Sequence, residues 1–428
     1  MITRTLTVGL LGFGTVGTGV VHLLQEHTDD IAARLGATLA VGPVAVRDPS
    51  RVRDIAVQQL TTDPADVVDN PDVDIVVEVM GGVDPAQGLI ERALRNGKSV
   101  VTANKELVAT VGFELEDIAS EKGVWLEYEA AVAGGIPIIK PLRESLAGDR
   151  VRRILGILNG TTNYILTKMT EEGVDFADAL AEAQRLGYAE ADPAADVGGA
   201  DAASKTAILA SLAFDARVVA DDVFREGITG VTATDIGHAR RMGYVIKLLG
   251  IAESTNGEIG VRVHPALVPQ AHPLASVRES FNAVFVDAEA VGDLMFYGRG
   301  AGSLPTASAV VGDIVSVARG VLSGERPGSG THRSTKRVRP MDDVIVQFYV
   351  LLDVADEPGV LAAVASAFGG HGVSIKSVWQ EGQDDRAQLL LITHAAREGD
   401  VQATLTDLRN LGGVRDIASV MRVEGGEG

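Results

Sequence analysis

Hydrophobic runs alternate with amphipathic stretches along the first third of the chain. Short apolar runs, typical of buried strands, occupy residues 5–11, 37–46, 73–80, 99–103 and 125–132. Apolar positions at helical spacing begin near Thr15, and residues 89–97 follow the same spacing. Strands that alternate with helices in this way predict an α/β domain with a doubly wound parallel sheet.

The pattern changes after about residue 135. Strand-like and helical segments now mix, at 152–160, 175–186, 200–213, 232–247, 260–268 and 281–291. The first and the last two of these segments have the pattern of strands, and the other three that of helices. We therefore expect a second, α+β domain that handles the substrate. A further helix at 305–320 is expected to return and pack on the first domain.

The last part of the chain predicts a small separate module. Residues 321–342 are rich in Gly, Pro, Ser and basic residues without periodicity, which indicates a linker. The order strand, helix, strand, strand, helix, strand then follows, at 344–355, 358–369, 373–380, 387–395, 400–411 and 414–423. This order is typical of a ferredoxin-like fold. The expected domains are residues 1–135 with about 303–320, residues 136–302, and residues 343–428.

Composition narrows the classes of protein. Hydrophobic residues make up 46% of the 428 residues and charged residues 22%, as expected of a folded chain. The net charge of −20 argues against nucleic acid or an anionic membrane as a partner. Neither a leader with a cleavage site nor a membrane-spanning run is recognised, so we expect a cytoplasmic protein. The chain has no cysteine, which excludes aldehyde oxidation through a thioester.

A glycine motif marks the first turn from strand to helix. The segment fits GxGxxG and consists of Gly12, Phe13, Gly14, Thr15, Val16 and Gly17. The first glycine allows a tight turn, the second lets a pyrophosphate approach the backbone, and the third lets helix and sheet pack closely. Because the N–H groups at a helix start bind phosphate, the motif predicts a Rossmann domain that binds a dinucleotide.

The end of the second strand bears on the choice of cofactor. An acidic residue there would bind a ribose hydroxyl, whereas an arginine would accommodate a 2′-phosphate. Arg47 comes before Asp48 in this chain. We expect NADP(H) to be preferred and NAD(H) to be possible. The alternative is that Arg47 is a solvated loop charge.

Asp201 and Lys205 are the first candidates for chemistry. On a helix they share one stripe with Ile208 and Leu212, and this stripe becomes apolar towards its C-terminal end. The pattern therefore favours an inward-facing acid–base pair, with a surface ion pair as the alternative.

Two further features suggest a site for a charged substrate. Acidic residues are dense just before this helix, at Glu190, Asp192, Asp196 and Asp201. They suit a substrate ammonium or a metal ion, although an exposed acidic loop is the alternative. Lys105 directly follows the fourth strand, at the edge of a parallel sheet where ligands bind. The alternative interpretation is that Lys105 is a surface lysine at the start of a helix.

Several motifs now occur together in order. GFGTVG, TANK, YEAAVAGGIP, NGTTNYIL and LGYAEADPAADVGGADAASK closely resemble the homoserine dehydrogenase family over residues 1 to about 320. The turn DEPGVL at 356–361 resembles that of an ACT domain, as in the single-function bacterial members. Many members have proline where this chain has Ala191, a departure that does not touch the proposed chemistry.

The resemblance implies reversible, NAD(P)H-dependent reduction of L-aspartate 4-semialdehyde to L-homoserine, in the pathway to threonine and methionine. By the same resemblance Lys205 is the general acid and Asp201 orients it, and Lys105 is the rival proton donor. The residues implied to bind substrate are Glu190, Asp196, Asp201, Lys105 and Gly187.

The resemblance also implies cofactor and cation sites. Besides the glycine motif and Arg47, the residues implied to line the cofactor are Thr102, Ala103, Lys105 and Gly302. A monovalent cation, usually sodium, is implied at Glu129, Val132, Gly134 and Ile136. Threonine is the implied effector of the ACT domain. The resemblance also implies a homodimer or homotetramer, with the dimer formed through the sheet of the second domain, residues 136–302.

Two other functions remain as alternatives. One is another amino-acid-pathway reductase, similar to dihydrodipicolinate reductase, but such a protein would lack the acidic loop followed by DAASK. The other is a catalytically silent amino-acid sensor. Retention of Lys105, Glu190, Asp201 and Lys205 together argues against a silent protein.

Overall fold

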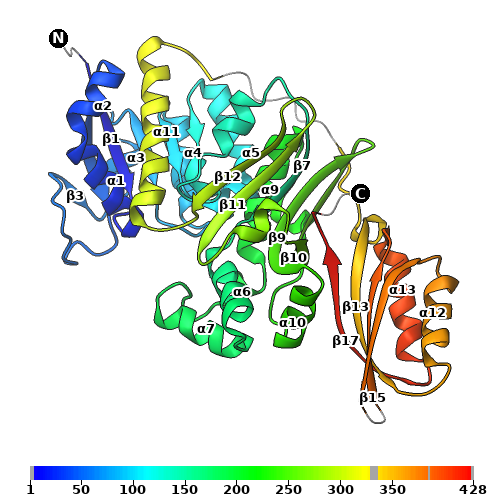
Figure 1. Ribbon diagram of the computed structural model, residues 1–428. Coiled ribbons are helices and arrows are strands. Elements are labelled where there is room, and N and C mark those ends of the chain that lie inside the picture. Colours follow the sequence, from blue (N-terminus) through cyan, green and yellow to red (C-terminus); the bar gives the residue numbers. More distant parts are fainter. Residues whose placement is uncertain (1–3, 328–335, 384–385, 426–428) are drawn as a thin grey trace. The chain divides into compact units, whose positions relative to one another are not determined.

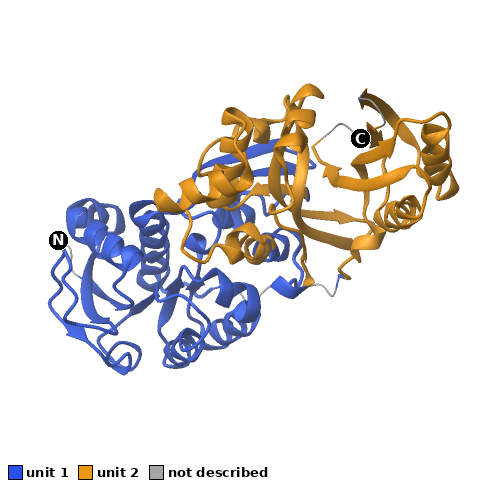
Figure 2. Cartoon of the chain, turned by 90° about the horizontal axis from the view of Figure 1, so that it is seen from below, with its two compact units in different colours: residues 1–152, 207–221, 282–336 blue, residues 153–206, 222–281, 337–428 orange. Residues whose placement is uncertain are grey.

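The structure is a computed structural model that describes residues 4–327, 336–383 and 386–425. The chain forms two compact units (Figure 2). Unit 1 comprises residues 1–152, 207–221 and 282–336. Unit 2 comprises residues 153–206, 222–281 and 337–428. These units cut across the predicted domains, whose boundaries stay a prediction.

Unit 1 contains a six-stranded sheet in the order β3-β2-β1-β4-β5-β6, with all neighbours parallel (Figure 1). The strands are β1 (Thr5–Leu11), β2 (Thr38–Ala45), β3 (Leu60–Thr61), β4 (Ile75–Glu78), β5 (Ser99–Thr102) and β6 (Leu126–Glu127). Strands β1 and β4 are apolar almost throughout, as expected where helices cover both faces of a sheet. The predicted doubly wound α/β fold is confirmed.

The helices of unit 1 complete its core. They are α1 (Thr15–Glu26), α2 (Thr28–Leu35), α3 (Ala65–Val68), α4 (Ala86–Arg95), α5 (Lys105–Lys122) and α11 (Ser303–Ser323). Helix α11 packs on α1, where a Cβ at Gly19 would lie only 2.9 Å from the Cβ of Ala307. Glycine at this position therefore allows the two helices to approach. Neighbouring strands β11 (Phe281–Ala288) and β12 (Gly292–Arg299) precede α11.

Helix α11 is strongly hydrophobic. Among the described helices it alone is long and apolar enough to cross a bilayer, a match that the sequence analysis does not recognise. Its residues Val310, Ile314 and Val317 are fully buried in the core that also contains β1. The core of unit 1 thus accounts for its hydrophobicity.

Unit 2 is built on strands in the order β7-β9-β10-β17-β13-β15-β14. Their bounds are β7 (Val151–Ile157), β9 (Tyr244–Thr255), β10 (Glu258–Pro269), β13 (Ile345–Ala355), β14 (Ile375–Gln383), β15 (Arg386–Thr393) and β17 (Val414–Val423). Asn256 and Gly257 connect β9 to β10 with φ of 54° and 83°. Two consecutive positive φ angles are typical of the hairpin turn that Asn-Gly favours.

The part of unit 2 that precedes the ACT-like module contains five of the described helices. They are α6 (Gly160–Glu172), α7 (Phe176–Arg185), α8 (Ala194–Val197), α9 (Ala200–Phe214) and α10 (Ala233–Arg241). Only the first turns of α9 belong to unit 2, since unit 1 resumes at Ala207. The short strand β8 (Phe224–Arg225) pairs with β10.

The last part of unit 2 has the predicted ferredoxin-like order. Helices α12 (Val360–Gly370) and α13 (Glu398–Arg409) cover one face of β13, β14, β15 and β17, and the short β16 (Ala396–Arg397) pairs with β13 (Figure 1). Strand β17 also pairs in parallel with β10, through Ala266 with Arg422 and Leu267 with Val423. The sheet of this module is therefore continuous with the sheet that contains β9 and β10.

Two predicted elements are wrong and one is only partly described. The sequence predicts a strand over 125–132, but β6 has two residues and a 3-10 turn follows at Glu129–Ala131. The sequence predicts a helix over 232–247, but α10 ends at Arg241 and Gly243, with φ of 81°, turns the chain into β9. Of the predicted linker 321–342, residues 328–335 lie outside the described residues.

The described end of the linker is attached to unit 2. The N–H of Ile259 donates to the Arg337 carbonyl at 3.0 Å, and the N–H of Arg339 donates to the Ile259 carbonyl at 2.7 Å. Residues 337–339 therefore run along β10.

Candidate active site

The glycine turn after β1 has the geometry that its motif predicts. Gly12 has φ of 105°, and a Cβ there would lie 2.9 Å from the Val79 carbonyl oxygen. A Cβ at Gly17 would lie 2.3 Å from the Gly12 carbonyl oxygen, so glycine lets α1 start close to β1. A Cβ at Gly14 would meet no atom within 4 Å. This open space at the N-terminus of α1 fits the pyrophosphate of a dinucleotide.

Arg53 lies against the same turn, and sequence reasoning missed it. Its Nε donates to the Phe13 carbonyl oxygen at 3.2 Å, and its guanidinium lies 5.4 Å from the centre of the buried Phe13 ring. Thr15 and Val16 begin α1 beside it, the first exposed and the second half-buried. No spacing rule connects Arg53 to a motif about forty residues earlier, so only the fold reveals it.

Arg47 and Asp48 follow β2 and are both exposed. The Asp48 carboxylate accepts from the N–H of Ser50 at 2.9 Å and from its hydroxyl at 2.6 Å. These bonds from Ser50 lower the pKa of Asp48. The carboxylate is thus engaged in its own turn, which leaves Arg47 as the better candidate for a contact with the cofactor.

The ends of β4 and β5 lie side by side. The buried Thr102 donates its hydroxyl to Glu78 Oε2 at 2.6 Å, and the half-buried Ala103 follows. Asn104 caps α5 with its side chain, so that the half-buried Lys105 begins this helix at the carboxyl edge of the sheet. The edge is where ligands bind in doubly wound folds.

Gly302 precedes α11 with φ of 119°. The next residue, Ser303, donates its hydroxyl to the Thr15 carbonyl oxygen at 2.7 Å. The first turn of α11 therefore lies at the start of α1, beside the glycine turn.

The candidate acid and base of unit 2 are paired and buried. Lys205 Nζ donates to Asp201 Oδ2 at 2.7 Å and to the Leu158 carbonyl oxygen at 2.7 Å. The two side chains are only 10% and 8% exposed. A solvated surface pair would be largely exposed, so the alternative interpretation from the sequence is wrong. An ammonium has three donors, and these contacts use two of them.

Asn159 organises the carboxylates around this lysine. Its Nδ2 donates to Asp201 Oδ2 at 2.9 Å and to Asp196 Oδ1 at 2.7 Å. Its Oδ1 accepts from the N–H of Thr162 at 2.8 Å and so caps α6. One buried amide thus holds two carboxylates and a helix start. Sequence reasoning quoted its motif, NGTTNYIL, but assigned this residue no role.

The remaining predicted substrate residues lie in the exposed loop between α7 and α8. Glu190 and Gly187 are both exposed, and Gly187 has φ of 77°. Gln184 binds the Glu190 carbonyl oxygen at 3.1 Å, and Thr161 binds that of Tyr188 at 2.7 Å. Among the described contacts, none joins the Glu190 side chain to the cluster at Lys205, so its role stays a prediction.

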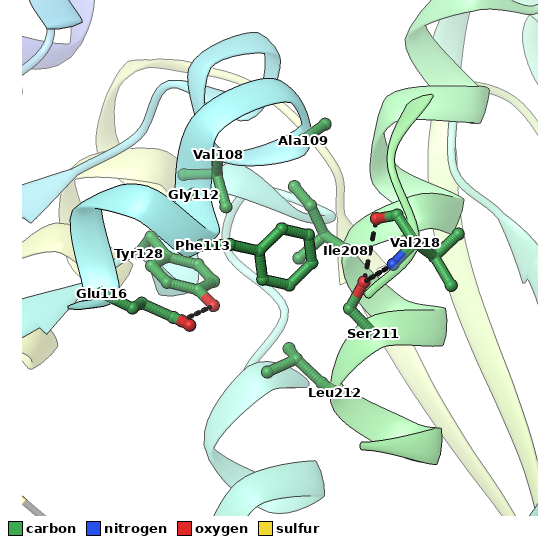
Figure 3. Close-up of a pocket in the computed structure, with 10 residues that line it drawn as sticks. All are labelled: Val108, Ala109, Gly112, Phe113, Glu116, Tyr128, Ile208, Ser211, Leu212 and Val218. Carbon is green, nitrogen blue, oxygen red and sulfur yellow. Dashed lines mark hydrogen bonds between the residues drawn. The ribbon is translucent and has the colours of Figure 1, made fainter. Parts of the chain in front are cut away.

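The last turns of α9 are held by α5 within unit 1. Figure 3 shows Phe113 of α5 beside Ile208 and Leu212 of α9, where they line a small pocket. Ser211 accepts from the N–H of Val218 at 3.2 Å and donates to its carbonyl oxygen at 3.0 Å. Ile208 is buried, as the helical stripe from Asp201 onward predicts.

The predicted cation loop is buried in unit 1. Glu129 Oε1 accepts from the N–H groups of Ile138 at 2.6 Å and Ile139 at 2.7 Å, and Oε2 accepts from that of Lys140 at 2.9 Å. A carboxylate has about four lone-pair positions, so one is left. Ala133 and Gly134 both have positive φ, 54° and 53°, and form a tight turn between Val132 and Ile136.

The described residues contain no group of three or more His, Asp or Glu side chains that could hold a metal. Besides the Glu129 carboxylate, a cation here would therefore need backbone carbonyl oxygens. Oxygen donors of this kind fit a hard monovalent cation.

A dinucleotide turn and a buried lysine–carboxylate pair define an NAD(P)-dependent oxidoreductase. Three family models match: the homoserine dehydrogenase NAD-binding domain over residues 12–129, homoserine dehydrogenase over residues 137–315, and the ACT domain over residues 348–413. The homoserine dehydrogenase of Corynebacterium glutamicum is 51% identical, over 97% of this chain and 95% of its own. The chain therefore belongs to the homoserine dehydrogenase family.

Solved structures agree with this assignment. The crystal structure of a homoserine dehydrogenase from Thiobacillus denitrificans is 42% identical, covers 98% of each chain and has a TM-score of 0.95. A hyperthermophilic archaeal homoserine dehydrogenase in complex with NADPH is 29% identical, covers 76% of this chain and 99% of its own, and has a TM-score of 0.63. The ACT module lies in the part that the first of these structures covers.

Proposed function

We propose that this member of the family reduces L-aspartate 4-semialdehyde reversibly to L-homoserine, in the cytoplasm, on the pathway to threonine and methionine. The observation that carries the proposal is the buried contact of 2.7 Å between Lys205 and Asp201, held by Asn159. A carbonyl that receives a hydride needs a proton at its oxygen, and a fixed ammonium can donate that proton. The nicotinamide, when bound, supplies the hydride.

Lys205 is the proton donor in this proposal. Its bonds to Asp201 and to the Leu158 carbonyl fix Nζ and leave one N–H for the aldehyde oxygen. Asp201 positions the lysine, and Asn159 positions Asp201. Lys105, at the start of α5, is the rival donor and otherwise binds the substrate or the nicotinamide end of the cofactor.

The acidic residues hold the substrate ammonium. Asp196 is fixed by Asn159 at 2.7 Å and supplies a carboxylate beside Lys205. Glu190, with Gly187 nearby in the exposed loop, supplies a second carboxylate when substrate is bound.

NADP(H) is the preferred cofactor and NAD(H) a possible one. Arg47 is exposed at the end of β2, and Asp48 is engaged by Ser50. The solved structure of the archaeal relative in complex with NADPH supports the same preference. Thr102 and Ala103 line the cofactor in this proposal, and Gly302 closes over it.

A sodium ion at Glu129, Val132, Gly134 and Ile136 is proposed from family resemblance. The buried carboxylate and the tight turn support it, because a hard cation needs several oxygen donors in a fixed arrangement.

The ACT module binds threonine as a feedback inhibitor, and the active form is a homodimer or homotetramer. The continuous pairing of β17 with β10 supports a regulatory role, because it joins the module directly to the sheet beside the catalytic helices. This role rests on the general use of ACT modules as amino-acid sensors.

One assay tests the activity. The purified protein is mixed with NADPH and aspartate semialdehyde, with and without threonine, while cofactor absorbance is followed. We expect turnover that threonine lowers. Absence of turnover would overturn the enzymatic proposal and favour a silent sensor. Turnover that threonine leaves unchanged would overturn only the regulatory part.

A further inference from the structure

Helix α10 lies against the face of the ACT sheet that α12 and α13 leave uncovered. Side chains alternate between the two faces of a strand. Phe348 and Val350 of β13 belong to the core under α12 and α13, so Tyr349 between them points the other way. Its hydroxyl donates to Asp235 of α10 at 3.3 Å. The catalytic part and the ACT module therefore meet at this face within unit 2.

A cavity of about 110 Å³ lies at this junction. Residues of α10, its C-terminal cap Met242 and strands β14 and β15 line it, namely His238, Arg241, Met242, Trp379, Glu381, Gln388 and Leu390. One water needs roughly 10–15 Å³ by the same measure, so the cavity holds a small organic molecule. We call it the junction cavity.

One wall of the junction cavity is a chain of polar groups. Arg241 Nη1 donates to Glu381 Oε1 at 2.7 Å, and Nη2 donates to His238 Nδ1 at 2.6 Å. Gln388 donates to Asp353 Oδ1 at 3.1 Å and also bonds His238. Burial, and next the charge of Arg241, lower the pKa of His238, so its ring is neutral at neutral pH. The wall thus presents one cation and one carboxylate side by side.

The other wall is apolar. Trp379 is 46% exposed although it is among the largest hydrophobic side chains of the chain, and it stands beside Leu390 and Met242. Exposed tryptophan surface that borders a cavity offers contact area to an apolar ligand.

We propose that the junction cavity binds a zwitterionic α-amino acid with an aliphatic side chain. The ligand carboxylate faces Arg241 and Gln388, its ammonium faces Glu381, and its side chain lies on Trp379. Arg241 and Glu381 are 57% and 61% exposed. An ion pair at that exposure is worth little, so a zwitterion can bridge the two groups without a large loss.

The junction cavity is separate from the turn of the ACT module. That turn, Ala355–Leu361, borders another cavity, of about 330 Å³, with Gln380 and Leu389. The two cavities share no lining residue. Regulation by threonine through the turn and ligand binding at the junction are therefore distinguishable proposals.

The position of the junction cavity suggests a consequence for the active site. Helix α10 packs on α6. The cap of α6 is Asn159, which holds Asp196 and Asp201. A ligand in the junction cavity thus contacts a helix that packs on α6, whose cap, Asn159, bonds Asp201, the partner of Lys205.

Tryptophan fluorescence tests the proposal without an activity assay. The chain has two tryptophans, Trp125 and Trp379, and the Trp125→Phe variant of the full chain reports on the cavity alone. We expect L-leucine to change its emission saturably, with a Kd of about 1 mM or below. Isocaproate lacks the ammonium and isoamylamine lacks the carboxylate, and each should bind at least about 10-fold more weakly.

Site variants locate the ligand. Glu381→Gln should weaken L-leucine binding about 10-fold or more, because the ammonium loses its carboxylate. Asp407→Asn, on the exposed surface of α13, is the matched control and should bind normally. Calorimetry repeats the comparison of Glu381→Gln with Asp407→Asn in protein that keeps Trp125, so that the result does not depend on Trp125→Phe.

Three results would overturn the proposal. The first is no saturable signal with L-leucine, L-methionine or L-threonine. The second is that isocaproate or isoamylamine binds as tightly as L-leucine. The third is binding that Asp356→Asn in the turn abolishes and Glu381→Gln leaves intact. This last result would leave the proposed threonine regulation standing, and loss of enzyme turnover would not affect the binding test.

Discussion

Arg422 of β17 donates to Glu226 Oε2 at 2.8 Å, and this pair joins the ACT module to the loop that follows β8. The same loop touches the acidic segment: the N–H of Ile228 donates to the Val197 carbonyl oxygen at 2.9 Å, and a Cβ at Gly227 would lie 2.2 Å from that oxygen. Val197 ends α8, the helix that contains Asp196. Three consecutive residues therefore contact both the regulatory module and the candidate substrate site.

We expect Glu226→Gln to weaken the response to threonine. The substitution removes one of the two carboxylate charges that Arg422 contacts, since Glu398 also binds it, and leaves the catalytic cluster untouched. Half-inhibition should require about 5-fold more threonine, with turnover in its absence unchanged. Asp416→Asn is the control, because Asp416 is an exposed carboxylate of β17, the strand that contains Arg422. An unaltered threonine titration in Glu226→Gln would show that regulation does not pass through this pair.

Lys205→Met should lower kcat by about 10²–10⁴-fold, because the alkoxide loses its proton donor. The KM for NADPH should stay nearly constant, since Lys205 belongs to the substrate cluster. Steady-state kinetics measure both constants.

Lys105→Met separates the two lysines. We expect a smaller fall in kcat than for Lys205→Met, with a higher KM for substrate. Lys122→Met, at the exposed last residue of the same helix, serves as the control and should behave as wild type. If Lys105→Met has the larger loss of kcat, Lys105 is the donor.

Asn159→Ser should lower kcat by about 10-fold or more while the Tm changes little. Serine caps a helix about as well as asparagine, so α6 keeps its start. Serine cannot reach both Asp196 and Asp201, and Asp201 then positions Lys205 less well. Thermal unfolding alongside kinetics distinguishes the two roles. If the Tm of Asn159→Ser falls together with its kcat, Asn159 has a purely structural role.

Arg47→Ala should raise the KM for NADPH by about 10-fold or more and leave that for NADH nearly constant, because only the first cofactor has a 2′-phosphate. Arg34→Ala, an exposed arginine of α2, controls for the change in charge. A parallel change with both cofactors would remove Arg47 from the phosphate site.

Glu424 follows β17, and its charge makes the contact between β17 and β10 sensitive to acid. Burial acts to raise the pKa of Glu424, but Arg262 and Arg153 together overcome it and lower the pKa to about 2. Arg262 Nη2 donates to Glu424 Oε1 at 2.7 Å. A carboxyl with a lowered pKa stabilises the fold above its ordinary pKa of about 4.5, and this contribution is lost as the pH falls towards 2.

We therefore expect Glu424→Gln to destabilise unit 2 by about 3 kcal/mol near neutral pH and by progressively less in acid. Tm values measured across the acid range for wild type and variant check this expectation. A difference in Tm that stays constant with pH would contradict the pKa assignment.

The sequence predicts those features that depend on local spacing. The glycine turn follows from six consecutive residues, Gly12 to Gly17, and the inward stripe of α9 follows from intervals of three and four. The cofactor half of the site is predicted for a different reason: residues at the ends of parallel strands lie at one edge of the sheet, even when the strands are distant in the chain.

Contacts between segments distant in the chain could not be predicted in this way. Arg53 reaches Phe13 only because the loop after β2 folds back over the glycine turn. Asn159 joins Asp196 and Asp201 across about forty residues, although its capping role is local. The predicted helix over 232–247 fails because the apolar positions after Gly243 suit a buried strand as well as a helix.

The parallel pairing of β17 with β10 has a consequence for biosynthesis. Residues 270–413 separate the two strands in the chain. At about 5–20 residues per second, a ribosome needs roughly 7–30 s to make that segment. During this time the stretch of β10 at Ala266 and Leu267 has been made but its partner strand has not. An unpaired strand edge invites pairing with other chains. The nascent catalytic half is thus exposed to this hazard for the whole interval, until β17 has been made and pairs with β10.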